Sequence, residues 1–174
     1  MLEYTCKNNG GPKRTFIMQI KKTKQNELEI KTKRADIVID GKVVINDVEL
    51  EGAGEYEIAG ISVEGLDDNI YLLNIEDIPS GLVDFKEKIS KENIEKLSNV
   101  DFLIAKVNGD TETALDQVNQ IEPNVVVYTG AKEVLQKIKA GGVSLSETED
   151  IKIRKTDISD EQKAYFVESN GKSA

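Results

Sequence analysis

The residues most suggestive of chemistry lie in the stretch Glu51–Leu66, which reads EGAGEYEIAGISVEGL. It contains four glycines and places Tyr56 between Glu55 and Glu57. Carboxylates exchange protons or hold hard cations, so this triplet could line a polar pocket. Side chains of a strand point alternately to its two faces, which would turn Tyr56 inward and both glutamates outward. The alternation favours such a strand over a catalytic triplet.

The sequence lacks the side chains that nucleophilic catalysis and zinc binding usually require. The chain contains no histidine, and its only cysteine is Cys6, so no internal disulfide can form. Neither Cys6, Ser144 nor Ser146 has a histidine that could act as its base. Zinc would have to rest on carboxylates alone, so we expect no zinc cofactor. The glycine pairs in residues 9–13 and 140–142 lack the spacing of a phosphate-binding loop and are expected to form turns.

Chain length and charge restrict the class of protein. A chain of 174 residues fits a single domain covering residues 1–174. Its net charge of −9 argues against nucleic-acid binding, because phosphates require a basic surface. Residues 1–42 nevertheless carry a net charge of +5, which predicts either a local basic patch or the solvent face of early strands. Without a run of about 18 apolar residues or a signal peptide, we expect a cytoplasmic protein with no membrane contact.

Two kinds of strand follow from the hydrophobic pattern. Apolar and charged residues alternate in the first half, which predicts antiparallel strands with one face toward water at 16–20, 27–30, 35–39, 43–45, 48–51 and 55–58. Nearly continuous apolar runs in the second half predict strands buried on both faces at 70–75, 102–107 and 125–128. Two further strands are predicted at 151–155 and 164–168.

Three helices are predicted between the later strands. The first has Ser90 as its N-cap, and the second begins at Asp110 or Thr111 and stops at Pro123. The third ends at Gly141 and is expected to bury Val134, Leu135 and Ile138. A strand-rich first half followed by alternating strands and helices predicts an α/β (α+β) layered domain.

Several segments, taken in chain order, resemble those of metallo-β-lactamase-fold hydrolases, in the lactonase-like zinc-dependent branch. GAGEYEIAGISVEG resembles the family's PGEYE-x-x-G-x-x-V-x-G segment, and QVNQIEPNVVVY is close to its LVNQIEPKIVIP helix and strand. ADIVI, NIYLLNIED, VDFLIAKVNG and IKIRKTDISDEQKAYFVE are similar to further family segments in the same order. The resemblance is clearest over residues 35–168 and weak before them.

The resemblance implies an αββα sandwich of two mixed sheets with outer helices, reduced in size, with a metal cleft at one edge between the sheets. The family's H-x-H-x-D-H metal loop is missing from this chain. Its HLGDL segment matches GLVDF, which places Gly81 at a histidine position and Asp84 at the aspartate position. Its last histidine falls at Gly130, and Asp110 could reach the same rim. Lys106, where the family has proline, could pair with Asp84 or point outward.

These departures predict a scaffold without zinc chemistry. The first interpretation is a pseudoenzyme, a non-catalytic member that acts as a binding or structural module. The alternative is a hydrolase that holds Mg²⁺ or Mn²⁺ in the remnant cleft through Asp84, Asp110 and one of Asp67 or Asp68. A third is an interaction protein whose basic N-terminal region contacts an acidic partner. The missing loops would leave sheet edges uncovered, which predicts a homo-oligomer or a protein partner.

Overall fold

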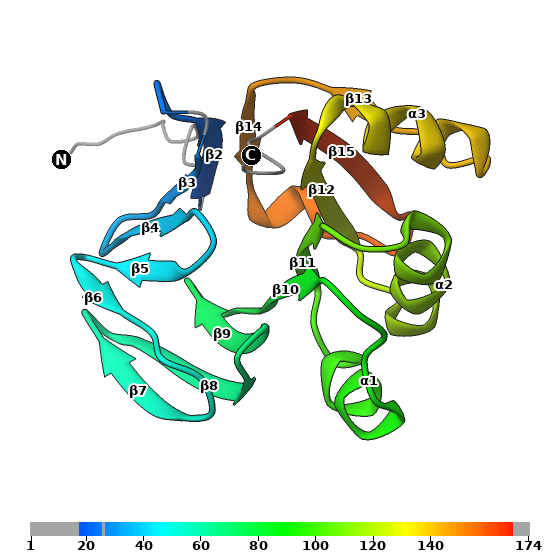
Figure 1. Cartoon of the computed structure of the whole chain (residues 1–174). Helices are drawn as coiled ribbons and strands as arrows, with labels where there is room; N and C mark the ends of the chain where they lie inside the picture. The colour runs from blue at the N-terminus through cyan, green and yellow to red at the C-terminus, as the bar shows by residue number, and fades with distance from the viewer. Residues whose placement is uncertain (1–17, 26, 169–174) are drawn as a thin grey trace, which may run out of the picture.

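The computed structural model describes residues 18–25 and 27–168, where two β-sheets and three α-helices form an α+β architecture (Figure 1). This confirms the predicted class. Cys6 lies outside the described residues, as do the first two residues of the strand predicted at 16–20. Within the described residues, no helix has both the length and the apolar composition needed to cross a bilayer.

Five of the six early, alternating strands, joined by one late strand, build an antiparallel sheet. Its six strands run in the order β14 (Asp150–Ile153), β2 (Met18–Lys22), β3 (Leu28–Lys31), β4 (Asp36–Ile39), β5 (Val43–Ile45) and β6 (Val48–Glu49). Their apolar residues face inward, and the least exposed of them are Met18, Ile20, Ile30, Ile37, Ile45 and Ile153, each at 0%. The sheet therefore has one buried and one wet face, as the alternation predicted.

Charges of opposite sign face each other on the outer side of this sheet. Lys21 lies opposite Glu29 on β3 and Asp150 on β14, and Lys31 lies opposite Asp36 on β4. Opposite charges on neighbouring strands stabilise a sheet modestly. Lys21 and Lys31 thus belong to the solvent face of early strands, whereas Lys24, Lys33 and Lys42 lie in the turns between strands.

The second sheet is mixed and has eight strands. An antiparallel meander of β7 (Gly54–Ile58), β8 (Ile61–Asp67), β9 (Ile70–Ile75) and β10 (Ile78–Phe85) continues into the parallel strands β11 (Phe102–Val107), β12 (Val125–Gly130), β15 (Lys163–Glu168) and β13 (Ser146–Glu147). β11 and β12 are central and buried along their whole length, as their continuous apolar runs predicted. The chain then crosses to the other sheet as β14 and returns as β15 after the 3-10 turn η2 (Lys155–Asp157).

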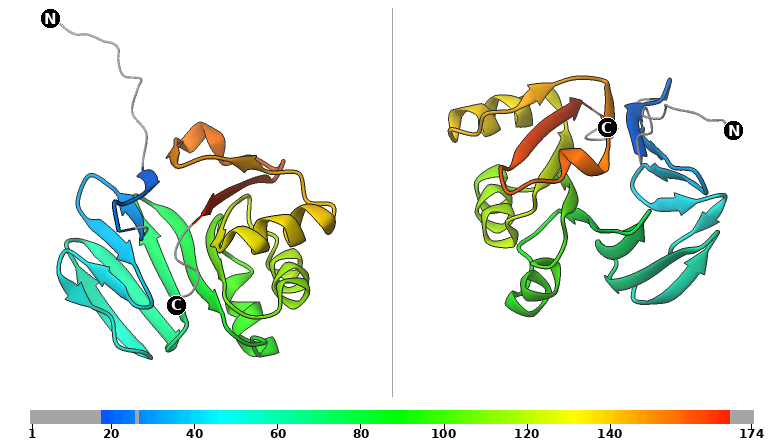
Figure 2. Two further views of the ribbon diagram at one scale, coloured as in Figure 1. Left: turned by 45° about the horizontal axis from the view of Figure 1, so that its top comes forward. Right: turned by 180° about the vertical axis from the view of Figure 1, so that it is seen from behind.

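Three helices lie on the outer face of the parallel part of the eight-stranded sheet (Figure 2): α1 (Lys91–Leu97), α2 (Thr111–Ile121) and α3 (Lys132–Ala140). Ser90 caps α1 by accepting a hydrogen bond from Asn93 N, and Asp110 caps α2 through Thr113 N. Of the three residues expected to be buried in α3, Ile138 is fully buried, whereas Val134 and Leu135 are partly exposed.

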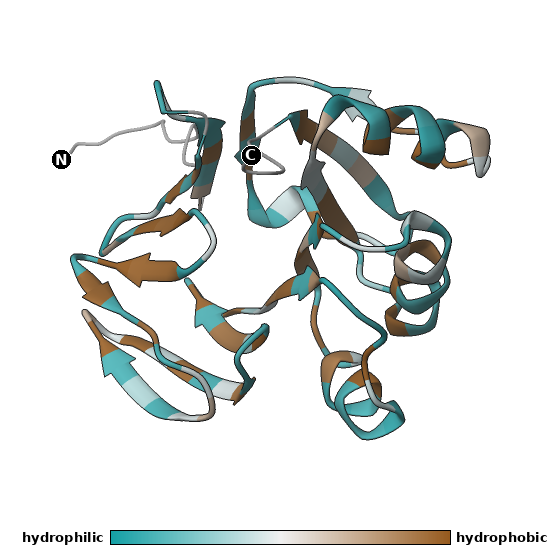
Figure 3. Ribbon diagram, in the orientation of Figure 1, coloured by the Kyte–Doolittle hydropathy of each residue, from teal (hydrophilic) through white to brown (hydrophobic). Residues whose placement is uncertain are grey.

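The core has two layers, which Figure 3 shows as brown stretches along the strands of both sheets and on the helices. One layer lies between the sheets and the other between the eight-stranded sheet and the helices. All buried apolar helix residues in the described chain belong to the second layer. The resemblance implied four layers, with two mixed sheets between two layers of helices. The six-stranded sheet is instead purely antiparallel and has no described helix on its outer face, so the described residues form three layers.

Candidate binding site between the sheets

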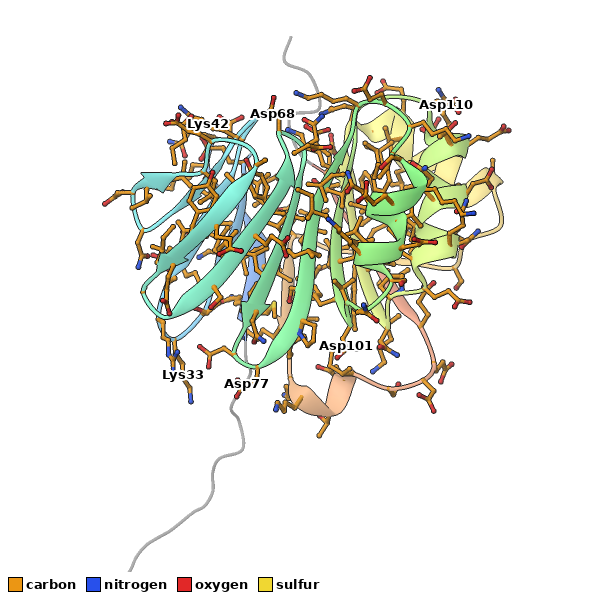
Figure 4. The ribbon with its side chains drawn as sticks, turned by 90° about the horizontal axis from the view of Figure 1, so that it is seen from below. Lys33, Lys42, Asp68, Asp77, Asp101 and Asp110 are labelled. Atoms are coloured by element: carbon orange, nitrogen blue, oxygen red, sulfur yellow. The ribbon has the colours of Figure 1, made fainter. Side chains whose placement is uncertain are left out.

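A cavity of about 290 Å³ lies between the two sheets, at the end where β10 and β11 finish. Figure 4 shows Lys42, from the β4–β5 turn, and Asp68, from the β8–β9 turn, at this end of the molecule, away from Lys33 and Asp77. The carboxyl ends of parallel strands are where sheets of this kind commonly bind ligands. The apolar part of the lining comes from both sheets and consists of Ile39, Val43, Leu50, Leu82, Val83 and Ile104.

Lys106 is a buried charge in the wall of this cavity. It lies on β11 two residues after Ile104, on the same inner face, and the residue is only 8% exposed. Among the described residues, its ammonium group makes no hydrogen bond and has no carboxylate oxygen within 4.0 Å. An ammonium group carries three donors, and burying donors without acceptors is costly. Lys106 therefore brings unused donors to the cavity.

Asp84 lies beside Lys106 but forms its hydrogen bond with a different residue. The parallel pairing of β10 with β11 places the two residues opposite each other, and both line the cavity. Oδ1 of Asp84, however, accepts a hydrogen bond from Asn108 Nδ2 at 2.8 Å. The structure thus shows neither of the two arrangements that the sequence suggested for Lys106, because the lysine points inward without forming an ion pair.

Two tyrosines fix the loop of residues 50–53, which forms one wall of the cavity. Tyr71 Oη accepts a hydrogen bond from Gly52 N at 3.0 Å and donates to Leu50 O at 3.5 Å. Tyr56 Oη donates to Gly52 O at 3.0 Å and accepts from Glu51 N at 3.2 Å. Burial raises the pKa of Tyr71, so its phenol stays protonated at pH 7 and can both donate and accept. The hydroxyls of Tyr56 and Tyr71 therefore hold this wall of the cavity in place by hydrogen bonds to its backbone.

The glycines of the GAGEYE stretch allow this loop to approach the sheet. Gly52 has φ +77°, a left-handed conformation that glycine adopts without strain. Gly65, in β8, packs so closely that an added Cβ would lie 2.2 Å from Gly52 O. Tyr56 points toward the core, while Glu55 and Glu57 are exposed, which confirms the predicted strand. The motif is explained by packing and turn geometry.

The charges that line the cavity are mainly acidic: Glu49, Glu51, Asp68 and Asp84 against Lys42 and Lys106. Lys42 lies in the exposed β4–β5 turn, and its ammonium group is 3.2 Å from a carboxylate oxygen of Glu49. Exposed pairs of this kind contribute little stability. The rim therefore repels species with several negative charges, while the buried lysine attracts a single acceptor group.

Of the four residues predicted for a remnant cleft, Asp84 lines this cavity, and the two glycines lie on the other face of the sheet. Gly81 is three residues before Asp84 in β10, and an odd spacing along a strand reverses the face. A Cβ added to Gly81 would lie 3.0 Å from the Leu97 side chain of α1. A Cβ added to Gly130 would lie 3.4 Å from the Val134 side chain of α3. Both positions pack against helices and do not contribute to the cavity.

Asp110 also lies outside the cavity, at the beginning of α2. Its carboxylate accepts hydrogen bonds from the hydroxyl of Thr113 at 2.7 Å and from Thr113 N at 3.0 Å. These bonds, the one from the hydroxyl first, lower the pKa of Asp110 below its usual value. Asp67 caps the following turn by accepting from Asn69 N at 2.7 Å, whereas its neighbour Asp68 lines the cavity.

The acidic residues do not form a cage for a cation. Asp68 and Asp84 share the cavity, but Asp110 lines a separate depression with Lys86 and Lys88. Among the described residues, no group of three or more carboxylate or thiol side chains converges on one point. No family model, curated protein or solved structure matches the chain. The geometry of the cavity is accordingly the basis on which a function can be proposed.

Two residues that line the cavity, Tyr71 and Lys106, were not assigned to it from the sequence. Tyr71 is part of a continuous apolar run and carries no local sign of its two hydrogen bonds. Lys106 was noted, and its spacing of two from Ile104 places it on the inner face once the strand is accepted. That period-two spacing is the signal that could have identified it as a cavity residue.

Proposed function

We propose that this chain is a metallo-β-lactamase-like protein that acts as a non-catalytic binding module, with the cavity between the sheets as its binding site. Two face-to-face sheets, helices outside one of them and a parallel block formed by β10, β11, β12 and β15 support the proposal. The segments that resemble the family also follow one another in the expected order, from residue 35 to residue 168.

The observation that carries the proposal is the chemistry of the cavity wall. The cavity lies at the edge between the sheets, where the resemblance expects a metal cleft, and Asp84 lines it. The chain has no histidine to complete a zinc site there, and one oxygen of Asp84 already accepts a hydrogen bond from Asn108. The cavity combines six apolar side chains from both sheets with six charged ones, and small-molecule sites likewise pair an apolar lining with polar groups that orient the ligand.

The alternative, a hydrolase with Mg²⁺ or Mn²⁺ on carboxylates, has one observation in its favour: Asp68 and Asp84 line the same cavity. Such cations need several oxygen ligands that converge from different segments. The third predicted ligand, Asp110, is bound to Thr113 at the beginning of α2 and lines a different depression. The binding module is therefore the function that the geometry supports best.

The experiment compares turnover with binding in the same preparation. Generic ester, lactone and phosphodiester substrates are incubated with wild-type protein and added Zn²⁺, Mn²⁺ or Mg²⁺, and a small-molecule fragment set is screened by thermal shift. We expect fragments that raise the melting temperature and no metal-dependent turnover. Turnover that needs the metal, is lost on chelation and is abolished by Asp84→Asn would contradict the proposal and favour the hydrolase.

A further inference from the structure

The buried lysine indicates which class of molecule the cavity accepts. Lys106 is 8% exposed, lines the cavity and makes no hydrogen bond or ion pair among the described residues. Its neighbour Asp84 on β10 forms no ion pair with it and instead accepts a hydrogen bond from Asn108. The three N–H donors of the ammonium group therefore remain available to an acceptor from outside the protein.

We propose that the cavity binds a small molecule with one carboxylate on an apolar body, and that the carboxylate accepts hydrogen bonds from Lys106 Nζ. This inference rests on the proposed binding function and specifies its ligand. A charge-assisted hydrogen bond between an ammonium group and a carboxylate is stronger than one between neutral groups, and it would satisfy the buried donors.

The surrounding charges select for a single negative group. Four carboxylates and two ammonium groups line the cavity, so every negative charge beyond the one bound by Lys106 meets net repulsion. Asp68 at the mouth is also suited to a ligand ammonium group. Simple carboxylic acids and α-amino acids share the required carboxylate, and the experiment separates them.

The walls and the volume set the size of the ligand body. The apolar lining of Leu50, Leu82 and Ile104 can cover a short hydrocarbon chain. The volume of about 290 Å³ corresponds to roughly ten water molecules at their share of liquid volume. A ligand with on the order of ten non-hydrogen atoms would therefore fill it.

Four probes of similar length test the inference on the full chain. Hexanoate carries one carboxylate, hexanamide is its neutral counterpart, adipate carries two carboxylates, and leucine adds an ammonium group. Binding is measured by saturation-transfer NMR and calorimetry on wild-type protein, Lys106→Met and Lys33→Met. Lys106→Met removes the buried charge at nearly constant length and leaves no hydrogen-bond partner behind among the described residues, so the variant should fold. Lys33→Met is the matched control, because Lys33 is exposed at the opposite end of the molecule and does not line the cavity.

We expect hexanoate or leucine to bind wild-type protein and to lose roughly tenfold or more in affinity with Lys106→Met, but not with Lys33→Met. Hexanamide and adipate should bind wild-type protein at least about tenfold more weakly. Tighter binding of leucine than of hexanoate would place its ammonium group near Asp68. Equal affinity of hexanoate for wild type and Lys106→Met, or equal affinity of hexanamide and hexanoate, would overturn the carboxylate inference while leaving a binding cavity. If none of the four probes binds, the inference fails; if the broader fragment set also finds no cavity ligand, the proposed function fails with it.

Discussion

Tyr71→Phe tests whether the wall of the cavity is fixed by the phenol beneath it. The substitution removes the acceptor for Gly52 N, which lies 3.0 Å from Tyr71 Oη, and the weaker bond to Leu50 O at 3.5 Å. Gly52 and Tyr71 are both buried, so the Gly52 amide has little access to bulk water that could replace the hydroxyl. A buried donor left without an acceptor costs about 1–3 kcal/mol. We expect the free energy of unfolding to fall by about 2 kcal/mol.

The assay is urea unfolding at pH 7, with Tyr165→Phe as the matched control. Tyr165 is a partly buried phenol that makes no hydrogen bond among the described residues, so its substitution should change stability by less than about 0.5 kcal/mol. With a typical m-value, the midpoint for Tyr71→Phe should fall by about 1 M at unchanged slope. A midpoint for Tyr71→Phe within error of the wild type and of Tyr165→Phe would refute the claim that Tyr71 fixes residues 50–53.

Three further substitutions test other contacts of the fold. Burial raises the pKa of Tyr128 to about 12 from 10.0, so the phenol holds its proton more tightly in the folded chain than in the unfolded chain. The contribution of the protonated phenol to the free energy of unfolding is therefore complete below pH 10 and is lost as the pH rises toward 12. Tyr128→Phe should therefore be close to neutral at pH 7, yet more stable than wild type by about 1.4 kcal/mol at pH 11 in urea unfolding, and parallel pH profiles would contradict this. Gln117→Met should lower the free energy of unfolding by about 2–4 kcal/mol in the same assay. The Gln117 amide accepts a hydrogen bond from Ile89 N at 3.0 Å and donates one to Ile89 O at 2.8 Å, and both residues are buried. A loss below about 1 kcal/mol would count against the importance of this pair of bonds. Gly65→Ala should lower stability by about 3 kcal/mol and weaken ligand binding, since its Cβ would lie 2.2 Å from Gly52 O, and an unchanged urea midpoint would show that the loop yields at little cost.

Much of the fold could be predicted because strand faces and helix ends depend on local residues. The alternation in β3 and β7 placed their apolar residues inward, since successive side chains point to opposite faces of any strand. Ser90 and Asp110 were predicted as N-caps from side chains that reach only as far as the first turn. These features need no knowledge of distant segments.

The strand β10 shows where local residues are insufficient. Pro79, Ser80 and Gly81 are typical of a loop, and the segment was matched to a family motif without being assigned as a strand. Its strand form comes from pairing with β9 on one side and β11 on the other. The hairpin that starts it turns at Glu76 and Asp77, both with positive φ, although neither is the glycine or asparagine that favours such a turn.

The candidate site was predicted only in part, because local residues are insufficient there as well. Asp84 was assigned to the remnant cleft by the resemblance of GLVDF to the family's HLGDL segment, and it lines the cavity. Gly81 and Gly130 were assigned by the same resemblance, but the face of a sheet that a residue occupies depends on strand boundaries and register. Helices on only one side of the molecule were likewise not foreseeable, because the early strands alone do not determine what covers their outer face.

Self-association stays a prediction. The described edges of the two sheets are β7, β13, β14 and β6, and uncovered edges can pair with another chain. Sedimentation at increasing protein concentration tests it directly. A concentration-dependent shift toward a dimer is expected, and a single monomer species at every concentration would contradict it.

The central claim is that the cavity between the sheets is where this protein binds its ligand. The most direct test is an amide chemical-shift map of the full chain during titration with a fragment set containing anionic, neutral and cationic molecules. Binding in the cavity predicts that the shifted amides cluster at residues 50–52, 68–71 and 82–84 and at Lys106, the segments that form its walls. Shifts that instead cluster around Asp110 and residues 85–88, or a map unchanged by every fragment, would contradict the account.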